Sequence, residues 1–143
     1  MRELLKLAEE IARRAHAGQV DKSGKAYIGH IERVAARVKS DEAKCVAWLH
    51  DVLEDTQALP EGEMRRLFGD AITDGVLSVT RQVDESYEAF VRRAGENPLG
   101  REVKISDLID NSNLSRLGVV TLKDAQRQRK YNEALIYLLA RKE

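Results

Sequence analysis

The sequence lacks the features that mark several large classes of protein. A single cysteine, Cys45, cannot form an internal disulfide, and three histidines without a CxxC pair exclude the usual zinc ribbons and fingers. No apolar run approaches the roughly 20 residues that span a bilayer, and the N-terminal segment interleaves charged and apolar residues, unlike a signal peptide. The 24 basic and 24 acidic residues balance, which argues against generic nucleic-acid binding. We therefore expect a cytoplasmic protein with neither a membrane nor a nucleic acid as partner.

Proline and glycine are also scarce, with two and nine residues among 143. No linker rich in proline, serine or glycine divides the chain, and its length suits one domain with its own core. The hydrophobic share of 43% and the charged share of 34% are those of a globular protein with a charged surface. We predict a single domain over residues 1–143.

Helical spacing dominates the distribution of apolar residues, and no segment alternates with a period of two. We therefore predict an all-α fold, a compact bundle of about seven or eight helices. Expected boundaries are a cap at Ser40 or Asp41, breaks at Gly69 and Gly95, a cap at Asn97 before Pro98, and a start at Thr121. The apolar stripes occupy residues 4–15, 31–38, 43–53, 64–68, 72–79, 87–94, 103–109 and 125–139.

The most informative stretch is WLHDVLEDT, residues 48–56, where polar groups interrupt an apolar helix. His50 and Glu54 are four residues apart, as are Asp51 and Asp55, so on one continuous helix each pair shares a face. Burying such groups unpaired costs several kcal/mol, whereas a divalent metal ion would satisfy them. The alternative is that the two later carboxylates face solvent and His50 is a hydrogen-bonded core histidine.

Four segments together resemble a known family. They are HAGQVDKSGKAYIGHIERVA (16–35), AWLHDVLEDT (47–56), ITDGVLSVTR (72–81) and VKISDLIDN (103–111). In order and spacing they resemble the HD superfamily of metal-dependent phosphohydrolases, named for adjacent His-Asp metal ligands. The resemblance is greater to the hydrolase domain of the RelA/SpoT group and its small stand-alone alarmone hydrolases. It covers most of the chain and implies an HD-domain helical bundle.

The resemblance also implies a set of metal ligands. They are His30 in YIGH, His50 and Asp51 in the HD pair, and Asp107 in KISDLIDN. Two imidazoles and two carboxylates suit Mn²⁺, with Fe²⁺, Co²⁺ or Zn²⁺ as other divalent metals that such ligands accept.

Catalytic and substrate-binding roles follow from the same resemblance. Glu54 and Asp55 are expected to handle the proton of the attacking water and to assist departure of the leaving oxygen. Lys22, Ser23 and Asn111 are expected to bind substrate, although the two loop residues have an equally good interpretation as solvated side chains. Further candidates are Lys25, Arg81 and Lys104. Cys45 is expected to be a core residue, and His16 to be either structural, anchoring the following loop, or a support behind the metal ligands.

The expected activity is that of a metal-dependent phosphohydrolase on a nucleotide or related phosphate ester. Its most specific form is guanosine-3′,5′-bis(diphosphate) 3′-pyrophosphohydrolase, which degrades ppGpp. The family usually has Arg where Asp21 stands and commonly His where Asp110 stands, so the resemblance leaves the substrate open. The alternatives are an HD nucleotidase or phosphodiesterase for another small anionic substrate, and a metal-bound module that senses a nucleotide. The oligomeric state also stays open.

Overall fold

The computed structural model describes residues 1–55, 59–113 and 117–140, apart from the side chains of Glu54 and Asp55. Within these residues every regular element is a helix, and the β contact found is an isolated bridge between Val20 and Ala26. The all-α prediction is therefore confirmed. The helices are α1 (Arg2–Ala15), α2 (Ile28–Arg37), α3 (Asp41–Leu49), α4 (Val52–Asp55), α5 (Glu61–Ser78), α6 (Tyr87–Glu96), α7 (Pro98–Asn111) and α8 (Leu122–Ala140).

Three helices begin at side-chain caps where the sequence predicts them. The Ser40 hydroxyl accepts a hydrogen bond from the Ala43 amide at the start of α3. Asn97 caps α7 by accepting from two backbone amides, with Pro98 in the first turn. At α8, Asp124 accepts from the Thr121 amide while the Thr121 hydroxyl accepts from the Asp124 amide. These reciprocal bonds satisfy amides that a helix start leaves without partners.

The two glycines at which helix breaks are predicted behave differently. Gly69 has a φ of 85° and a ψ of 176°, so α5 consists of two helical segments joined at a kink. The predicted break there is confirmed, because a positive φ suits glycine far better than residues with a Cβ. Gly95 does not end its helix as predicted, since α6 continues to Glu96. Gly95 is instead buried within the helix.

The predicted third helix does not continue through Leu53, and this part of the prediction is wrong. Helix α3 ends at Leu49, and α4 begins only at Val52. In an unbroken helix the Ala47 carbonyl would accept the amide of the residue four positions later. Here that carbonyl accepts from Nδ1 of His50 at 2.6 Å and from the His50 amide at 3.4 Å. The side chain of His50 thus takes the place of the next helical hydrogen bond, and the chain turns.

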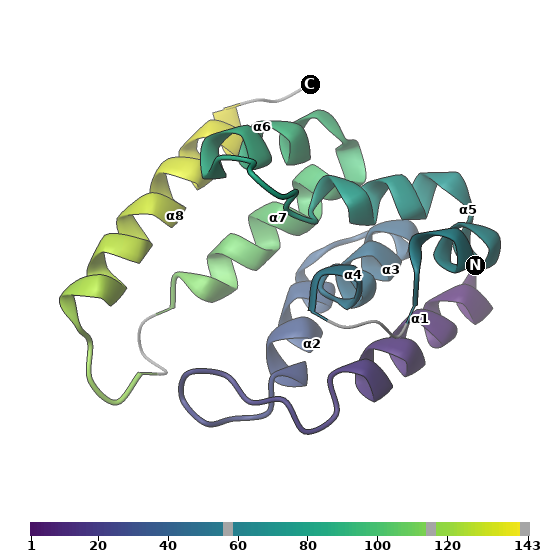
Figure 1. The fold of residues 1–143 in the computed structure, drawn as a ribbon, viewed down its shortest axis with the longest axis horizontal. Helices are drawn as coiled ribbons and strands as arrows, with labels where there is room; N and C mark the ends of the chain where they lie inside the picture. Colours follow the sequence, from purple (N-terminus) through teal and green to yellow (C-terminus); the bar gives the residue numbers. More distant parts are fainter. Residues whose placement is uncertain (56–58, 114–116, 141–143) are drawn as a thin grey trace.

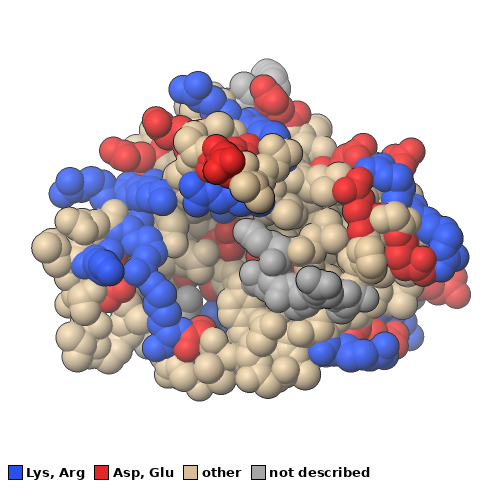
Figure 2. Space-filling model, in the orientation of Figure 1, with Lys and Arg blue, Asp and Glu red and all other residues tan. Residues whose placement is uncertain are grey.

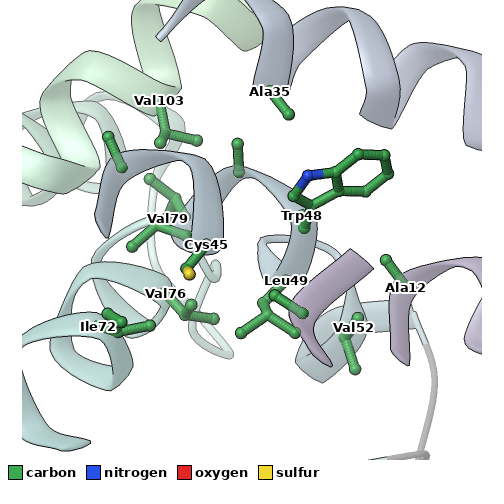
Figure 3. Close-up of a cluster of buried hydrophobic side chains, with 14 of the residues drawn as sticks. Ala12, Ala35, Cys45, Trp48, Leu49, Val52, Ile72, Val76, Val79 and Val103 are labelled. Carbon is green, nitrogen blue, oxygen red and sulfur yellow. The ribbon is translucent and has the colours of Figure 1, made fainter. Parts of the chain in front are cut away.

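Buried apolar residues form two clusters that share α6 and α7. The large core joins α1, α2, α3, α4 and α5 to Ala94 of α6 and to one side of α7, and Figure 3 shows Leu49, Val76 and Val103 among its members. The small core lies between α6, α7 and α8 and consists of Val91, Leu108, Ala134 and Leu138. Figure 1 shows α7 between α8 and the helices of the large core.

Cys45 is fully buried in the large core, and burial raises the pKa of its thiol to about 11, in keeping with a structural role. On α8 the expected burial of Ala134 and Leu138 is confirmed, whereas Leu139 is exposed. Acidic and basic side chains are interspersed over the face in Figure 2. Of the helices in the described ranges, none combines the length and apolarity that crossing a membrane requires.

Candidate metal centre and adjoining pocket

Three predicted metal ligands from three parts of the fold meet beside the large core. His30 lies in the first turn of α2, His50 directly follows α3, and Asp107 lies on α7. One candidate ligand atom from each lies within 4.8 Å of the other two. All three residues are buried, with exposed fractions of 5, 3 and 8%. The arrangement could hold a metal ion.

Hydrogen bonds at the far side of each ring determine which nitrogen faces the cluster. Nδ1 of His50 lies 2.6 Å from the Ala47 carbonyl, which can only accept, so this nitrogen carries the proton. Nδ1 of His30 donates in the same way to the Asp110 carboxylate at 2.7 Å. The Nε2 atoms of the two rings lie 2.9 and 3.6 Å from Oδ1 of Asp107. In the neutral rings both Nε2 lone pairs are therefore available where a metal ligand needs them.

The strongest sign that these residues fit a metal ion is the state of Nε2 in His50. This atom is buried and forms no hydrogen bond within the described part of the chain. Carboxylate oxygens of Asp51 and Asp107 lie 3.3 and 3.6 Å away from it. In the neutral ring this lone pair faces carboxylate oxygens, and a buried polar atom without a hydrogen bond costs about 1–3 kcal/mol. A divalent cation bound by imidazole and carboxylate would remove that cost.

Burial and charge act in opposite directions on the ionisation of the cluster. Burial would lower the pKa of His50, but the Asp51 and Asp107 carboxylates outweigh it and raise the value to about 9. Burial would likewise raise the pKa of Asp107, but Lys104 and the two imidazoles hold it well below its usual range. Without metal the cluster is thus an array of opposite charges. Metal binding to it must displace protons from the imidazoles.

Asp51, the fourth predicted ligand, lies at the edge of this cluster. Its Oδ2 is 3.3 Å from Nε2 of His50 and accepts a short hydrogen bond from the Tyr27 hydroxyl. It does not belong to the group of three whose ligand atoms lie within 4.8 Å of one another. Its role as a ligand stays a prediction.

A pocket of about 330 Å³ adjoins the metal centre and brings the predicted substrate contacts together. Lys22, Ser23 and Asn111 all line it. Asn111 also donates to Oδ1 of Asp107 at 3.2 Å, so it connects the pocket to the cluster. Residues from the loop after α1, the end of α7 and the first half of α8 therefore surround one space.

The loop that carries Lys22 and Ser23 is held by Asp21. Oδ1 of Asp21 accepts from the backbone amides of Ser23 and Lys25 at 2.8 and 3.0 Å. Gly24 adopts a φ of 80°, and the Asp21 amide donates to the Lys25 carbonyl at 2.7 Å. Asp21 thus closes a tight turn, a common role for aspartate. Asp21 is also one of the residues that line the pocket.

The remaining candidates are dispersed. Lys104 is buried and donates to Oδ2 of Asp107 at 3.2 Å, while Arg81 is exposed and donates to the Glu85 carbonyl, away from the pocket. His16 is buried as expected, and its Nδ1 lies 2.9 Å from the Gln19 side chain at the start of the loop. The side chains of the predicted catalytic pair, Glu54 and Asp55, lie outside the described residues.

Sequence reasoning missed the contribution of the last helix. Arg127, Gln128 and Tyr131 of α8 line the pocket. Arg127 and Tyr131 are four residues apart and so share a helix face, which is a recognisable pattern. That pattern alone does not say which face turns toward a site 20 residues earlier in the chain. Tyr27 was missed for the same reason, since its partner Asp51 is 24 residues away.

Comparisons with known proteins agree with this fold. The chain is 31% identical to a GTP pyrophosphokinase of Streptomyces coelicolor over 141 residues, which is 90% of the chain and 16% of that relative. It is 42% identical to the bifunctional (p)ppGpp synthase/hydrolase SpoT of Escherichia coli over 81 residues, 54% of the chain and 11% of that relative. The chain thus spans a small part of the curated relatives that it matches. No family model matches.

A solved structure supports the architecture over nearly the whole chain. It is described as a metazoan ortholog of SpoT that hydrolyses ppGpp, and it superposes with a TM-score of 0.73 at 21% identity. The match covers 95% of this chain and 85% of the other. At that identity the likeness establishes the fold. Sequence and fold together support the recognition made from the motifs: the chain forms an HD-type domain like the hydrolase domain of the RelA/SpoT proteins.

Proposed function

We propose that the chain, as one domain over residues 1–143, is a metal-dependent phosphohydrolase that removes the 3′-diphosphate of guanosine 3′,5′-bis(diphosphate). Water is consumed, the diphosphate is transferred to it, and GDP and pyrophosphate are released. The observation that carries this proposal is the buried cluster of His30, His50 and Asp107 beside a pocket lined by Lys22 and Asn111. The names of the relatives, which include SpoT and ppGpp hydrolases, support it.

Metal binding and proton transfer are assigned to different residues of the chain. His30, His50 and Asp107 hold a divalent ion, with Asp51 as a fourth ligand, and Mn²⁺ suits this mixture of nitrogen and oxygen donors. Such an ion, when bound, polarises a phosphoryl oxygen and acidifies water. Glu54 and Asp55 come shortly after Asp51 in the chain and belong to α4. We assign to them the role of accepting the proton of the attacking water and returning it to the leaving oxygen.

Substrate is bound by the pocket. The Lys22 ammonium pairs with phosphate, and the Ser23 hydroxyl donates a further hydrogen bond. Asn111 orients the ribose or the phosphate under attack, because its amide lies against Asp107. The substrate is a small nucleotide.

A second candidate is an HD nucleotidase or phosphodiesterase for another small anionic substrate. The pocket favours it in one respect, because Asp21 and Asp124 line the same space as Lys22 and Arg127, and Asp124 pairs with Arg127. A pocket with such a mixed lining attracts a highly charged anion less strongly than a purely basic pocket does. A substrate with fewer phosphates than ppGpp would suit this balance.

The deciding experiment measures phosphate and pyrophosphate release from a nucleotide panel, with and without Mn²⁺. Mn²⁺-dependent pyrophosphate release from guanosine 3′,5′-bis(diphosphate) supports the proposal. Release from other nucleotides only supports the second candidate. Metal binding without turnover of any member leaves a nucleotide-sensing module as the better description.

Two variants test the assigned roles. Asp51→Ala should abolish both metal binding and turnover if Asp51 is a ligand, and full activity of this variant would remove it from the site. Glu54→Gln should retain the metal and lose turnover, because the amide cannot accept the proton. Unchanged turnover in Glu54→Gln would exclude this residue from the mechanism.

A further inference from the structure

A second carboxylate, Asp110, is buried behind the metal cluster on the same helix as Asp107. It is 1% exposed, and its Oδ2 lies 2.7 Å from Nδ1 of His30. The cluster uses the opposite nitrogen of that ring. We propose that Asp110 is a positioning residue that orients His30 for metal binding, with Arg33 and Arg37 holding Asp110 in place. The proposal rests on the metal site of the proposed function.

Arg33 and Arg37 stabilise the buried carboxylate of Asp110. Nε and Nη2 of Arg33 donate to its two oxygens at 2.7 and 3.1 Å, and Nη2 of Arg37 lies 3.3 Å from Oδ1. A buried carboxylate without such partners would be strongly unfavourable, and a two-pronged guanidinium contact fixes its plane as well as its charge. Asp110 therefore presents an ionised oxygen to His30 in one orientation.

Helical spacing explains how these groups come together. His30, Arg33 and Arg37 follow one another at intervals of three and four on α2, so they share one face. Asp107 and Asp110 are three residues apart on the facing helix α7. Helix α2 thus provides the candidate ligand His30 and the two arginines, while α7 provides the candidate ligand Asp107 and the carboxylate that contacts His30.

The consequence for His30 is chemical as well as geometric. An ionised carboxylate at Nδ1 keeps the proton on that nitrogen, leaves Nε2 as the ligand atom and makes the ring a better donor to a metal. Removal of such a supporting carboxylate typically weakens metal binding by about 10- to 100-fold. A purely structural role as a link between α2 and α7 predicts a loss of stability with unchanged metal affinity.

The link between α2 and α7 has other members, which makes the two roles separable. The Ser106 hydroxyl of α7 donates to the Val34 carbonyl at 2.9 Å, and Arg37 lies 3.4 Å from the Ser106 carbonyl. Neither contact is made by the Asp110 side chain. We therefore expect the Asp110→Asn variant to fold, which its circular dichroism and melting temperature would verify.

The experiment compares Mn²⁺ dissociation constants, measured by electron paramagnetic resonance of free Mn²⁺, for four forms of the full chain. Asp110→Asn should bind about 10- to 100-fold more weakly than the unchanged protein. Arg33→Gln keeps the contact between Asp110 and His30, so its Mn²⁺ affinity should fall by less than that of Asp110→Asn. The control Glu85→Gln breaks a salt bridge to Arg93 in another part of the fold and should bind normally.

A second readout follows the ring itself. Long-range ¹H–¹⁵N spectra of the Zn²⁺-loaded protein should show a protonated Nδ1 in His30, with its proton signal shifted in Asp110→Asn. Normal Mn²⁺ affinity in a folded Asp110→Asn overturns the positioning role alone. Failure of the unchanged protein to bind metal overturns the proposed function as well. Should Asp110→Asn not fold, the double variant Arg33→Gln/Arg37→Gln must show the weakened affinity, and normal affinity there overturns the proposal.

Discussion

The large core and the small core of this protein position different parts of the candidate site. Leu49, in the large core, directly precedes His50, and Ile31 of the same core directly follows His30. The small core is limited to a few residues of α6, α7 and α8, yet it holds the helix that contributes Arg127 and Tyr131 to the pocket. The metal cluster therefore depends mainly on the large core and the α8 wall of the pocket on the small core, with α6 and α7 common to both, so variants can affect one more than the other.

The first prediction compares two fully buried leucines, one in each core. Leu49→Ala should lower the free energy of unfolding by about 3 to 5 kcal/mol, because the dense packing around it leaves a cavity. Leu138→Ala should cost about 2 to 3 kcal/mol, because the smaller cluster can close around the gap more easily. Urea denaturation of both variants measures the difference.

The same pair separates metal binding from substrate binding. Leu49→Ala should weaken Mn²⁺ binding, whereas Leu138→Ala should keep it and raise KM, because α8 contributes side chains to the pocket and none to the group of three candidate ligands. Equal effects of the two variants on Mn²⁺ affinity would show that the two regions are not independent.

The second prediction removes one charge from the metal cluster. Asp107→Asn should weaken Mn²⁺ binding by more than about 100-fold, because losing a ligand costs more than losing a supporting residue. Mn²⁺ should raise the melting temperature of the unchanged protein and leave that of the variant where it is. Calorimetric titration and thermal melts measure both effects, and a Mn²⁺ shift of equal size in the variant would contradict the assignment.

The third prediction concerns the wall of the pocket on α8. Arg127→Ala should raise KM for a nucleotide about tenfold, the value of one charge-assisted hydrogen bond, with unchanged Mn²⁺ affinity. Arg129 is a matched control, since it lies on the same helix, is exposed and does not line the pocket. Steady-state kinetics of Arg127→Ala and Arg129→Ala give the comparison. A tenfold effect in both would point to general electrostatics instead.

The smallest effect is expected at the salt bridge between Glu85 and Arg93. Arg93 holds the pKa of Glu85 at about 2, below the value near 4.3 of an unfolded chain. A lowered pKa means that the stabilisation is complete above the unfolded value and is lost as the pH falls from about 4 to about 2. Glu85→Gln should therefore cost about 1 kcal/mol at pH 7.

Denaturation curves at several pH values test this salt bridge. The difference between Glu85→Gln and the unchanged protein should shrink below pH 4, and a difference independent of pH would exclude the ionised pair as its source. Metal affinity at neutral pH should be the same in both.

Much of the local structure could be predicted from particular residues. Asn97 and Thr121 marked helix starts because their side chains accept hydrogen bonds from backbone amides that otherwise lack partners. Both starts are confirmed. The predicted continuation of the third helix is wrong, because His50 bonds back to the Ala47 carbonyl. Helical periodicity does not reveal that a side chain replaces a backbone donor.

The candidate site was predictable in its chemistry and less so in its support. The motifs singled out His30, His50 and Asp107, which the fold brings within reach of one ion. Spacing alone gave no role to Asp110 or to Arg127. Both depend on how distant segments pack.

The sequence by itself determined the all-α fold class, most helix starts and the residue types able to bind a metal, because these follow from interactions between near neighbours in the chain. The tertiary structure decided which nitrogen of His30 faces the cluster, because the partner of the other nitrogen is Asp110, 80 residues away. It also decided that Asn111 and α8 share a pocket with the loop at Lys22. These outcomes depend on helix packing, since contacts between residues 80 positions apart form only when the cores assemble.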